Sequence, residues 1–279
     1  MRRLALLIIL LAPATAFAQK AETEVLHDGS FVVSTDVELA PEKAKAVLDR
    51  VKAAWEYVSS ELDWKEKDVL ARDVKLHVLD DASMKTRFGA KVKGHASGKD
   101  DFFVARTFLD EERSARTLAH ELTHLQDRRH LETKGARLPH WLTEGRAVTV
   151  GRGYEAKLGI SDKKYGDDIA RVASDVSPAE AKRILEDDAY VAEKKMPSIF
   201  RMEAAGFFFL EFVRVKLQVE DLEKKLGRVV ARVGKGATLE DAFEAEVGTK
   251  LSSARSAFYE YLEDVKGPKR LEWPAVQRH

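Results

Sequence analysis

Two histidines and a glutamate in TLAHELTHLQDRRH, residues 117–130, have the spacing of a zinc hydrolase site. His120 and His124 are four residues apart, so on a helix of 3.6 residues per turn their rings share one face and can bind one metal ion. Glu121 lies beside that face, where its carboxylate can take a proton from a zinc-bound water without being a ligand. The pattern H-E-x-x-H therefore predicts a hydrolytic zinc site.

The alternative is an amphipathic helix that carries two surface histidines and binds no metal. Residues typical of a protein core flank the motif, namely Leu118, Ala119, Leu122 and Leu125. They predict a helix that is largely buried, and histidines on such a helix need polar partners. A metal site is therefore the better interpretation, and a helical scaffold with fortuitous histidines is kept as the alternative that predicts no bound metal.

A catalytic zinc needs a third protein ligand and an open position for water. His130 is the first candidate, because metzincins place their third ligand at this eleventh position of the motif. Metzincins have a glycine at the eighth position, which lets the chain leave the helix, whereas this chain has Asp127, which adopts positive φ far less readily. If the helix continues, His130 lies about 240° around from His124 and faces away.

Glu144 is the second candidate, in the segment PHWLTEGRA about twenty residues beyond the H-E-x-x-H motif. Pro139 can open a helix here, and Trp141 and Leu142 can pack its apolar side. Gly145 permits a close approach of this helix to the first one. This arrangement predicts that the Glu144 carboxylate reaches the zinc.

The two motifs together, HELTH and then WLTEGRA, resemble the gluzincin branch of zinc metallopeptidases, specifically the bacterial exported peptidase-MA-like domains. The resemblance extends over roughly residues 30–265. It implies a zincin-like fold with one Zn²⁺ per chain, held by His120, His124 and Glu144, and with Glu121 as the general base. It also implies that the strand around 102–106 is an edge strand along which an extended peptide substrate adds.

One position departs from the gluzincin pattern. Many gluzincins have a tyrosine that hydrogen-bonds the oxyanion, whereas the corresponding residues 199–202 here read IFRM. Arg201 could stabilise the tetrahedral intermediate by its charge or be a structural arginine, and Tyr154, Tyr165 and Tyr190 are further candidates. The departure supports a second hypothesis, an exported zinc-binding pseudo-peptidase that binds peptides or envelope proteins.

The elements around the motifs change character along the chain. Residues 30–39 and 74–79 read as strands, with His77 as a solvated strand residue, and the glycine-containing segment 91–101 reads as a loop leading into another strand near Phe102. A helix starts at Pro41, and further helices start at Ser177 and Thr238. Strands early and helices late predict an α+β fold, with a small N-terminal sheet packed on the H-E-x-x-H helix and a mainly helical C-terminal lobe.

The domain organisation follows from the same reading. Residues 1–18 have two arginines, a short apolar run and the small residues Ala16 and Ala18, which is typical of a signal peptide. Residues 19–279 form the metallopeptidase domain, with an α/β lobe to about 150 and a helical lobe over about 176–266. Residues 151–176 contain four glycines and no sustained period, which predicts a loop with room for one short helix.

Composition bounds the partners and the location. The 47 basic residues balance the 47 acidic ones, which argues against a nucleic-acid partner. The chain has no cysteine, so thiolate-held zinc and disulfides are excluded. Beyond the leader no apolar run is long enough to span a membrane. We therefore expect an exported protein, periplasmic or secreted, that acts on a peptide or protein substrate.

Overall fold

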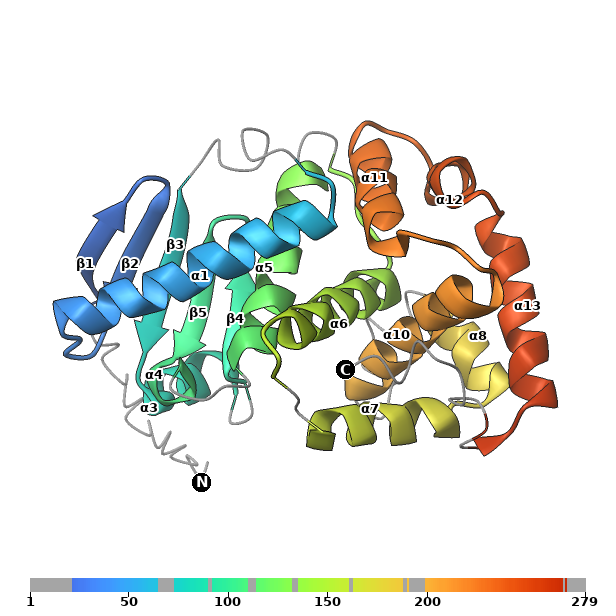
Figure 1. The fold of residues 1–279 in the computed structure, drawn as a ribbon, viewed down its shortest axis with the longest axis horizontal. Coiled ribbons are helices and arrows are strands. Elements are labelled where there is room, and N and C mark those ends of the chain that lie inside the picture. The colour runs from blue at the N-terminus through green and yellow to red at the C-terminus, as the bar shows by residue number, and fades with distance from the viewer. Residues whose placement is uncertain are drawn as a thin grey trace, which may run out of the picture.

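A mixed β-sheet forms the N-terminal part of the fold in the computed structural model (Figure 1). The structure describes residues 22–64, 73–89, 92–109, 114–131, 135–160, 163–187, 190, 199–267 and 269. Within them, the sheet has the order β1-β2-β3-β5-β4, with β1 at Thr23–Asp28, β2 at Phe31–Thr35, β3 at Val74–Leu79, β4 at Gly94–Ser97 and β5 at Asp101–Ala105. The three inner strands are parallel, and β1 and β4 pair antiparallel at the two edges.

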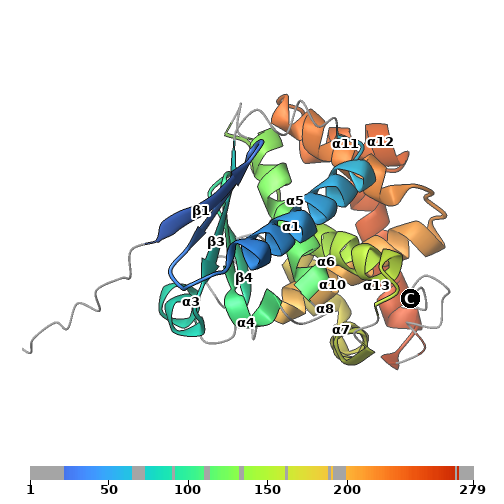
Figure 2. The same ribbon diagram turned by 60° about the vertical axis from the view of Figure 1, so that its left-hand side comes forward.

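Helices cover both faces of this sheet. The helix α1 (Pro41–Glu61) begins with proline at its first position and buries one apolar side, including Leu48, Val51 and Trp55. Figure 2 shows α1 and α5 (Ser114–Leu131) on one side of the sheet and α3 (Asp81–Phe88) on the other. The short helix α4 (Arg106–Leu109) follows β5 directly. The H-E-x-x-H helix is thus packed against the sheet, as predicted.

The C-terminal part consists of helices (Figure 1). They are α6 (His140–Lys157), α7 (Lys163–Asp175), α8 (Pro178–Glu186), α10 (Ile199–Lys216), α11 (Leu222–Gly234), α12 (Leu239–Val247) and α13 (Leu251–Asp264). The phenylalanines of α10 pack around Phe258 of α13, with ring centroids of Phe208 and Phe209 at 5.3 and 5.4 Å from it. The apolar run of α10 thus forms part of the core.

All strands of the described residues lie before α4 and only helices follow, as predicted, although α1 and α3 alternate with the strands. Several helix starts are also confirmed. Ser177 caps α8 by accepting a hydrogen bond from the backbone of Glu180, and Thr238 caps α12 in the same way from Asp241. Gly248 ends α12 in the left-handed conformation, with φ of 87°. Because these signals lie within a few residues of each other, the sequence alone reveals them.

The prediction of a loop over residues 151–176 is wrong. Helix α6 continues to Lys157, and α7 occupies Lys163–Asp175. The glycines of α6 allow neighbouring chains to approach closely. A methyl group on Gly151 would lie 2.8 Å from the carbonyl oxygen of Arg116 on α5, and one on Gly153 would collide with the Tyr57 hydroxyl on α1.

Three predictions about the sheet also need correction. The segment before β5 contains a strand, β4, which forms a hairpin with β5 through a turn in which Gly98 has φ of 57°. Strand β5 is therefore an inner strand, and β4 is the edge. His77 is not simply solvated, since its ring stacks on Phe103 at 4.3 Å and its nitrogens meet Glu22 and Asp101.

Some predictions fall on residues outside those described, namely the signal peptide at 1–18 and the side chain of Tyr165. None of the helices in the described part of the chain is long and apolar enough to cross a membrane.

Candidate metal centre

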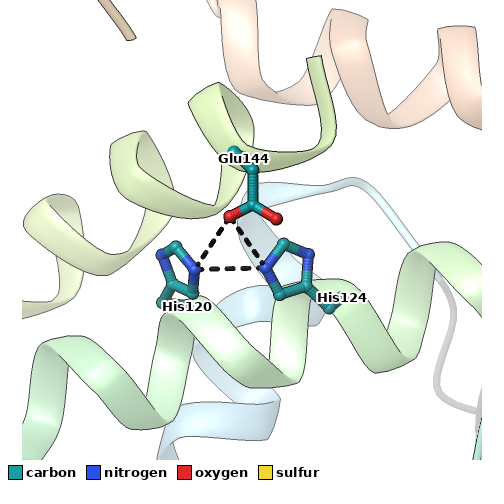
Figure 3. Close-up of side chains that lie close together, drawn as sticks. All are labelled: His120, His124 and Glu144. Atoms are coloured by element: carbon teal, nitrogen blue, oxygen red, sulfur yellow. Dashed lines mark hydrogen bonds and ion pairs between the residues drawn. The ribbon is translucent and has the colours of Figure 1, made fainter. Parts of the chain in front are cut away.

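Helices α5 and α6 bring His120, His124 and Glu144 together (Figure 3). The Nε2 atoms of the two histidines are 3.1 Å apart. The Oε2 atom of Glu144 lies 3.4 Å from each of them. The three predicted ligands therefore face one point between the two helices, from motifs that are far apart in the sequence.

The spacing of these three atoms fits a metal ion. Zinc bonds to histidine nitrogen and carboxylate oxygen are about 2.0–2.2 Å long, so a tetrahedral arrangement places neighbouring ligand atoms about 3.4 Å apart. The observed separations of 3.1 and 3.4 Å are close to this value. Two imidazoles and one carboxylate also leave a fourth position for water or substrate. The group can thus hold a metal ion.

The unbroken course of α5 decides between the two candidates for the third ligand. The helix runs through His130 to Leu131, so His130 lies on another face, as predicted. Its ring packs against Trp64 with centroids 3.8 Å apart. His130 is therefore a packing residue, and Glu144 is the third member of the group that could hold a metal ion.

Close packing of α6 between two other helices places Glu144. A methyl group on Gly145 would lie 2.6 Å from the backbone carbon of Gly206 on α10. Trp141, one turn earlier, is buried and meets the Phe209 ring edge-on at 5.3 Å. The apolar side of α6 thus faces α10, which leaves Glu144 directed at α5 (Figure 3).

The charges of the site suit a cation. Burial acts to lower the pKa of His120, but its hydrogen bond to Glu144 and the nearby carboxylates outweigh burial and raise this pKa to about 9. Burial likewise acts to raise the pKa of Glu144, whereas His124 and His120 hold it well below its usual range. In the metal-free site His120 therefore carries a proton, and this positive charge lies where a metal ion would bind.

Glu121 is oriented by the edge of the sheet. Its Oε2 atom accepts a hydrogen bond of 2.8 Å from the backbone N–H of Ala96 on β4. Gly94 makes this approach possible, because a methyl group there would lie 2.6 Å from the Cγ2 atom of Thr117 and 3.4 Å from the Cγ atom of Glu121. A backbone donor thus fixes the carboxylate beside the metal ligands.

The polar groups of Ala96 point away from β5. Ala105 donates its N–H to the carbonyl oxygen of Lys93, directly before β4, so the alternation of an antiparallel ladder turns the N–H and carbonyl groups of Ala96 toward the outer edge of β4. Side chains of α5 satisfy both of its groups, since Glu121 accepts from the N–H and Arg128 donates to the carbonyl oxygen at 2.8 Å. The strand at the site is therefore β4, and residues 102–106, which were predicted as the edge, lie behind it.

Glu203 on α10 is a site residue that the sequence did not reveal. Burial raises its pKa, and the charges next in influence are those of His120, Glu144 and His124. Its carboxyl group therefore lies within the electrostatic reach of the metal centre. The signal available in the sequence was the first of two glutamates in an otherwise apolar helical segment, MEAAGFFFLEFV.

Three candidates for an oxyanion-stabilising group, Arg201, Tyr154 and Tyr190, have other partners. Arg201 forms two hydrogen bonds with Glu180 of α8, at 2.6 and 2.5 Å. Tyr154 is buried against Tyr57, with ring centroids 5.0 Å apart. Tyr190 lies beneath the guanidinium group of Arg183 at 3.9 Å. The arrangement gives each of these side chains a structural role.

No protein-family model matches the chain, and a search of curated proteins finds no significant match. What can be said of function comes from the residues of the site and their geometry.

Proposed function

We propose that this protein is a zinc-dependent peptidase of the gluzincin type with a zincin-like fold. The observation that carries the proposal is the convergence of His120, His124 and Glu144 within 3.4 Å of one another, with Glu121 as the next residue on the same helix. Ligands of this kind with one open position are typical of catalytic zinc, whereas structural zinc sites are closed by four protein ligands.

The chemistry divides between the ion and the chain. A zinc ion held by the three ligands supplies Lewis acidity, which polarises a peptide carbonyl and lowers the pKa of water. Glu121 takes the proton of the attacking water and passes it to the leaving nitrogen, which is the role of a general base and then a general acid. The N–H of Ala96 keeps the Glu121 carboxylate in place for both transfers.

A peptide substrate is favoured by the neighbouring strand. Extended peptides bind to sheet edges by adding a further strand, and β4 is the edge strand beside Glu121. Because Ala96 on this edge is bonded to Glu121 and Arg128, a peptide that adds along β4 has to displace these bonds. It would present a carbonyl group to the metal ligands and to the water that Glu121 deprotonates. The leader at residues 1–18 supports an exported location, periplasmic or secreted.

A second candidate function is a zinc-binding pseudo-peptidase that recognises peptides. The specific observation in its favour is the double hydrogen bond between Arg201 and Glu180, which occupies the arginine found where many gluzincins have a tyrosine. Without a group to stabilise the oxyanion, hydrolysis would lose one of its largest contributions. The two candidates share the metal site and differ in turnover.

The first experiment measures zinc per chain in the purified wild type, in Glu144→Ala and in His130→Ala after matched dialysis. We expect one zinc in the wild type and in His130→Ala, and much less in Glu144→Ala. Full occupancy in Glu144→Ala would remove Glu144 as a ligand, and an empty wild type would remove the metal site.

The second experiment separates the enzyme from the binding module. A peptide library is incubated with the wild type and with Glu121→Gln, which keeps the shape of the side chain but not its basicity. Cleavage by the wild type alone, with zinc retained in both, supports the peptidase. Equal peptide binding by both proteins and cleavage by neither supports the pseudo-peptidase.

A further inference from the structure

A buried ion pair joins the two helices that carry the metal ligands. The Nη1 atom of Arg146 on α6 donates to both carboxylate oxygens of Asp127 on α5, at 2.9 and 2.8 Å. Each side chain is only 1% exposed. Asp127 is three residues beyond His124, and Arg146 is two residues beyond Glu144. The pair therefore lies within one helical turn of a ligand on each helix.

This pair is a costly way to fill the interior. Removing two charges from water costs several kcal/mol for each ion, and well-packed apolar side chains of similar volume are often as stable or more stable. Burial raises the pKa of Asp127, and the neighbouring Arg146 opposes that rise, which reflects this cost. Stability alone thus gives a weak reason for an ion pair at this position.

The geometry of the pair suits the setting of a register. Two hydrogen bonds to one carboxylate hold only when α5 and α6 keep one relative position, whereas apolar contacts tolerate a slip along the helices. The Nε and Nη2 atoms of Arg146 are buried with no hydrogen-bond partner among the described residues, so Asp127 supplies the bonds that orient the guanidinium group there. A shift of α6 along α5 would therefore displace Glu144 and at the same time break the bonds between Arg146 and Asp127.

We propose that Asp127 and Arg146 are positioning residues that fix the register of α5 against α6 and so keep Glu144 at bonding distance from a metal ion on the two histidines. The proposal rests on the metal site of the proposed function but not on peptidase turnover. It also gives a role to the aspartate at the eighth position of the first motif, where metzincins have glycine.

The test compares zinc affinity with stability in a variant that replaces the whole pair, Asp127→Leu with Arg146→Met. Zinc affinity is measured by competition with a chromophoric chelator, and the stability of the metal-free protein by urea unfolding. We expect stability equal to or above that of the wild type, because no unpaired charge is left buried. We expect zinc affinity to fall at least about tenfold, the loss typical of residues that orient metal ligands.

A conservative variant guards against misfolding of the double variant. Arg146→Lys keeps the charge but replaces the planar guanidinium group by a compact ammonium group with a different reach, so we expect a folded protein with an intermediate loss of zinc affinity. Wild-type affinity in either folded variant would overturn the proposal. So would a loss of affinity that merely follows a loss of stability, since that would make the pair structural.

The matched control is a second arginine–carboxylate pair far from the site in sequence, Arg228 on α11 with Glu246 on α12 at 2.8 Å. We expect Glu246→Gln to leave zinc affinity unchanged, and a matching loss there would also overturn a specific role for Asp127 and Arg146. A wild type without zinc would overturn the metal site itself, whereas wild-type affinity in the double variant would overturn only the positioning role.

Discussion

Two clusters in this protein place histidine beside carboxylate, and they differ in what their nitrogen atoms face. On the sheet, His77 has Glu22 at 2.5 Å from Nδ1 and Asp101 at 2.9 Å from Nε2. Between α5 and α6, His120 and His124 point their Nε2 atoms at one place, shared with the Glu144 carboxylate. The sheet cluster is divergent, whereas the helix cluster, drawn in Figure 3, is convergent.

The difference explains why only one cluster resembles a metal site. In the sheet cluster each ring nitrogen of His77 bonds to a different carboxylate. These two bonds link residue 22 to β3 and β5. In the helix cluster the lone pairs of three ligand atoms point at one place and, without a proton there, repel one another. A cation bound there removes this repulsion. Both clusters contain histidine and carboxylate groups, so their residue types do not distinguish them. The direction of the lone pairs distinguishes a metal site from a structural pair.

The largest expected effect concerns Glu121, the proposed general base beside the convergent cluster. Glu121→Gln should lower kcat for peptide cleavage by about 10²–10⁴-fold, the contribution of a general base, while zinc content stays at one per chain. His77→Gln serves as the control and should leave kcat unchanged. Equal activity of Glu121→Gln and the wild type would remove Glu121 from catalysis.

Loss of the carboxylate from each cluster should affect metal binding differently. Glu144→Ala removes a ligand and should weaken zinc binding by more than about 100-fold, beyond the loss for residues that only orient ligands. Asp101→Ala removes a partner of His77 and should not change it. Calorimetric titration of the metal-free proteins with zinc measures both affinities, and similar losses in the two variants would contradict the distinction.

Proton competition should mark the convergent cluster. Because the pKa of His120 is about 9 in the metal-free protein, zinc must displace a proton below that pH, and apparent affinity should fall about tenfold per pH unit from about pH 8 to about pH 6. An affinity that does not vary over this range would show that His120 binds no proton there.

The same titration has an effect on stability with a definite sign. The pKa of His120 in the folded, metal-free protein lies above its ordinary value of 6.5. The resulting stabilisation is therefore complete below about pH 6.5 and is lost as the pH rises through about 9. Urea unfolding of the metal-free wild type and of His120→Gln at several pH values measures it, and the difference between them should shrink as the pH rises.

The convergent cluster was predictable because its signals are local. Four-residue spacing on one helix fixes His120 and His124, and the second motif, WLTEGRA, supplied Glu144 as a predicted ligand. Even the exclusion of His130 followed from the helical repeat. Glu203 was missed because its position depends on how α10 packs beside α6, and no pattern within one segment encodes that.

The divergent cluster was not predictable for a related reason. Glu22 and Asp101 are 55 and 24 residues from His77, so alternation along β3 indicated only a solvated face. The glycines of α6 led to a wrong loop prediction for the same reason. Gly151 and Gly153 read as loop residues, although they serve the contacts of α6 with Arg116 and Tyr57. In each case the missing information was the neighbour across a tertiary contact.

The smallest expected effect concerns the divergent cluster itself. Burial acts to raise the pKa of Glu22, but hydrogen bonds with His77 and Arg87 hold it below its usual value, so this stabilisation is present at neutral pH and is lost as the pH falls through that lowered pKa. His77→Gln should lower the free energy of unfolding by about 1 kcal/mol at neutral pH, because the side chains are partly exposed and glutamine can replace one of the bonds. Urea unfolding measures the loss, which should shrink in acid.

Zinc affinity should not change, since the ring of His77 faces carboxylates on the other side of the sheet from α5. A fall in zinc affinity with this variant would mean that the two clusters are coupled through β5 and β4, and the contrast between them would then describe one network.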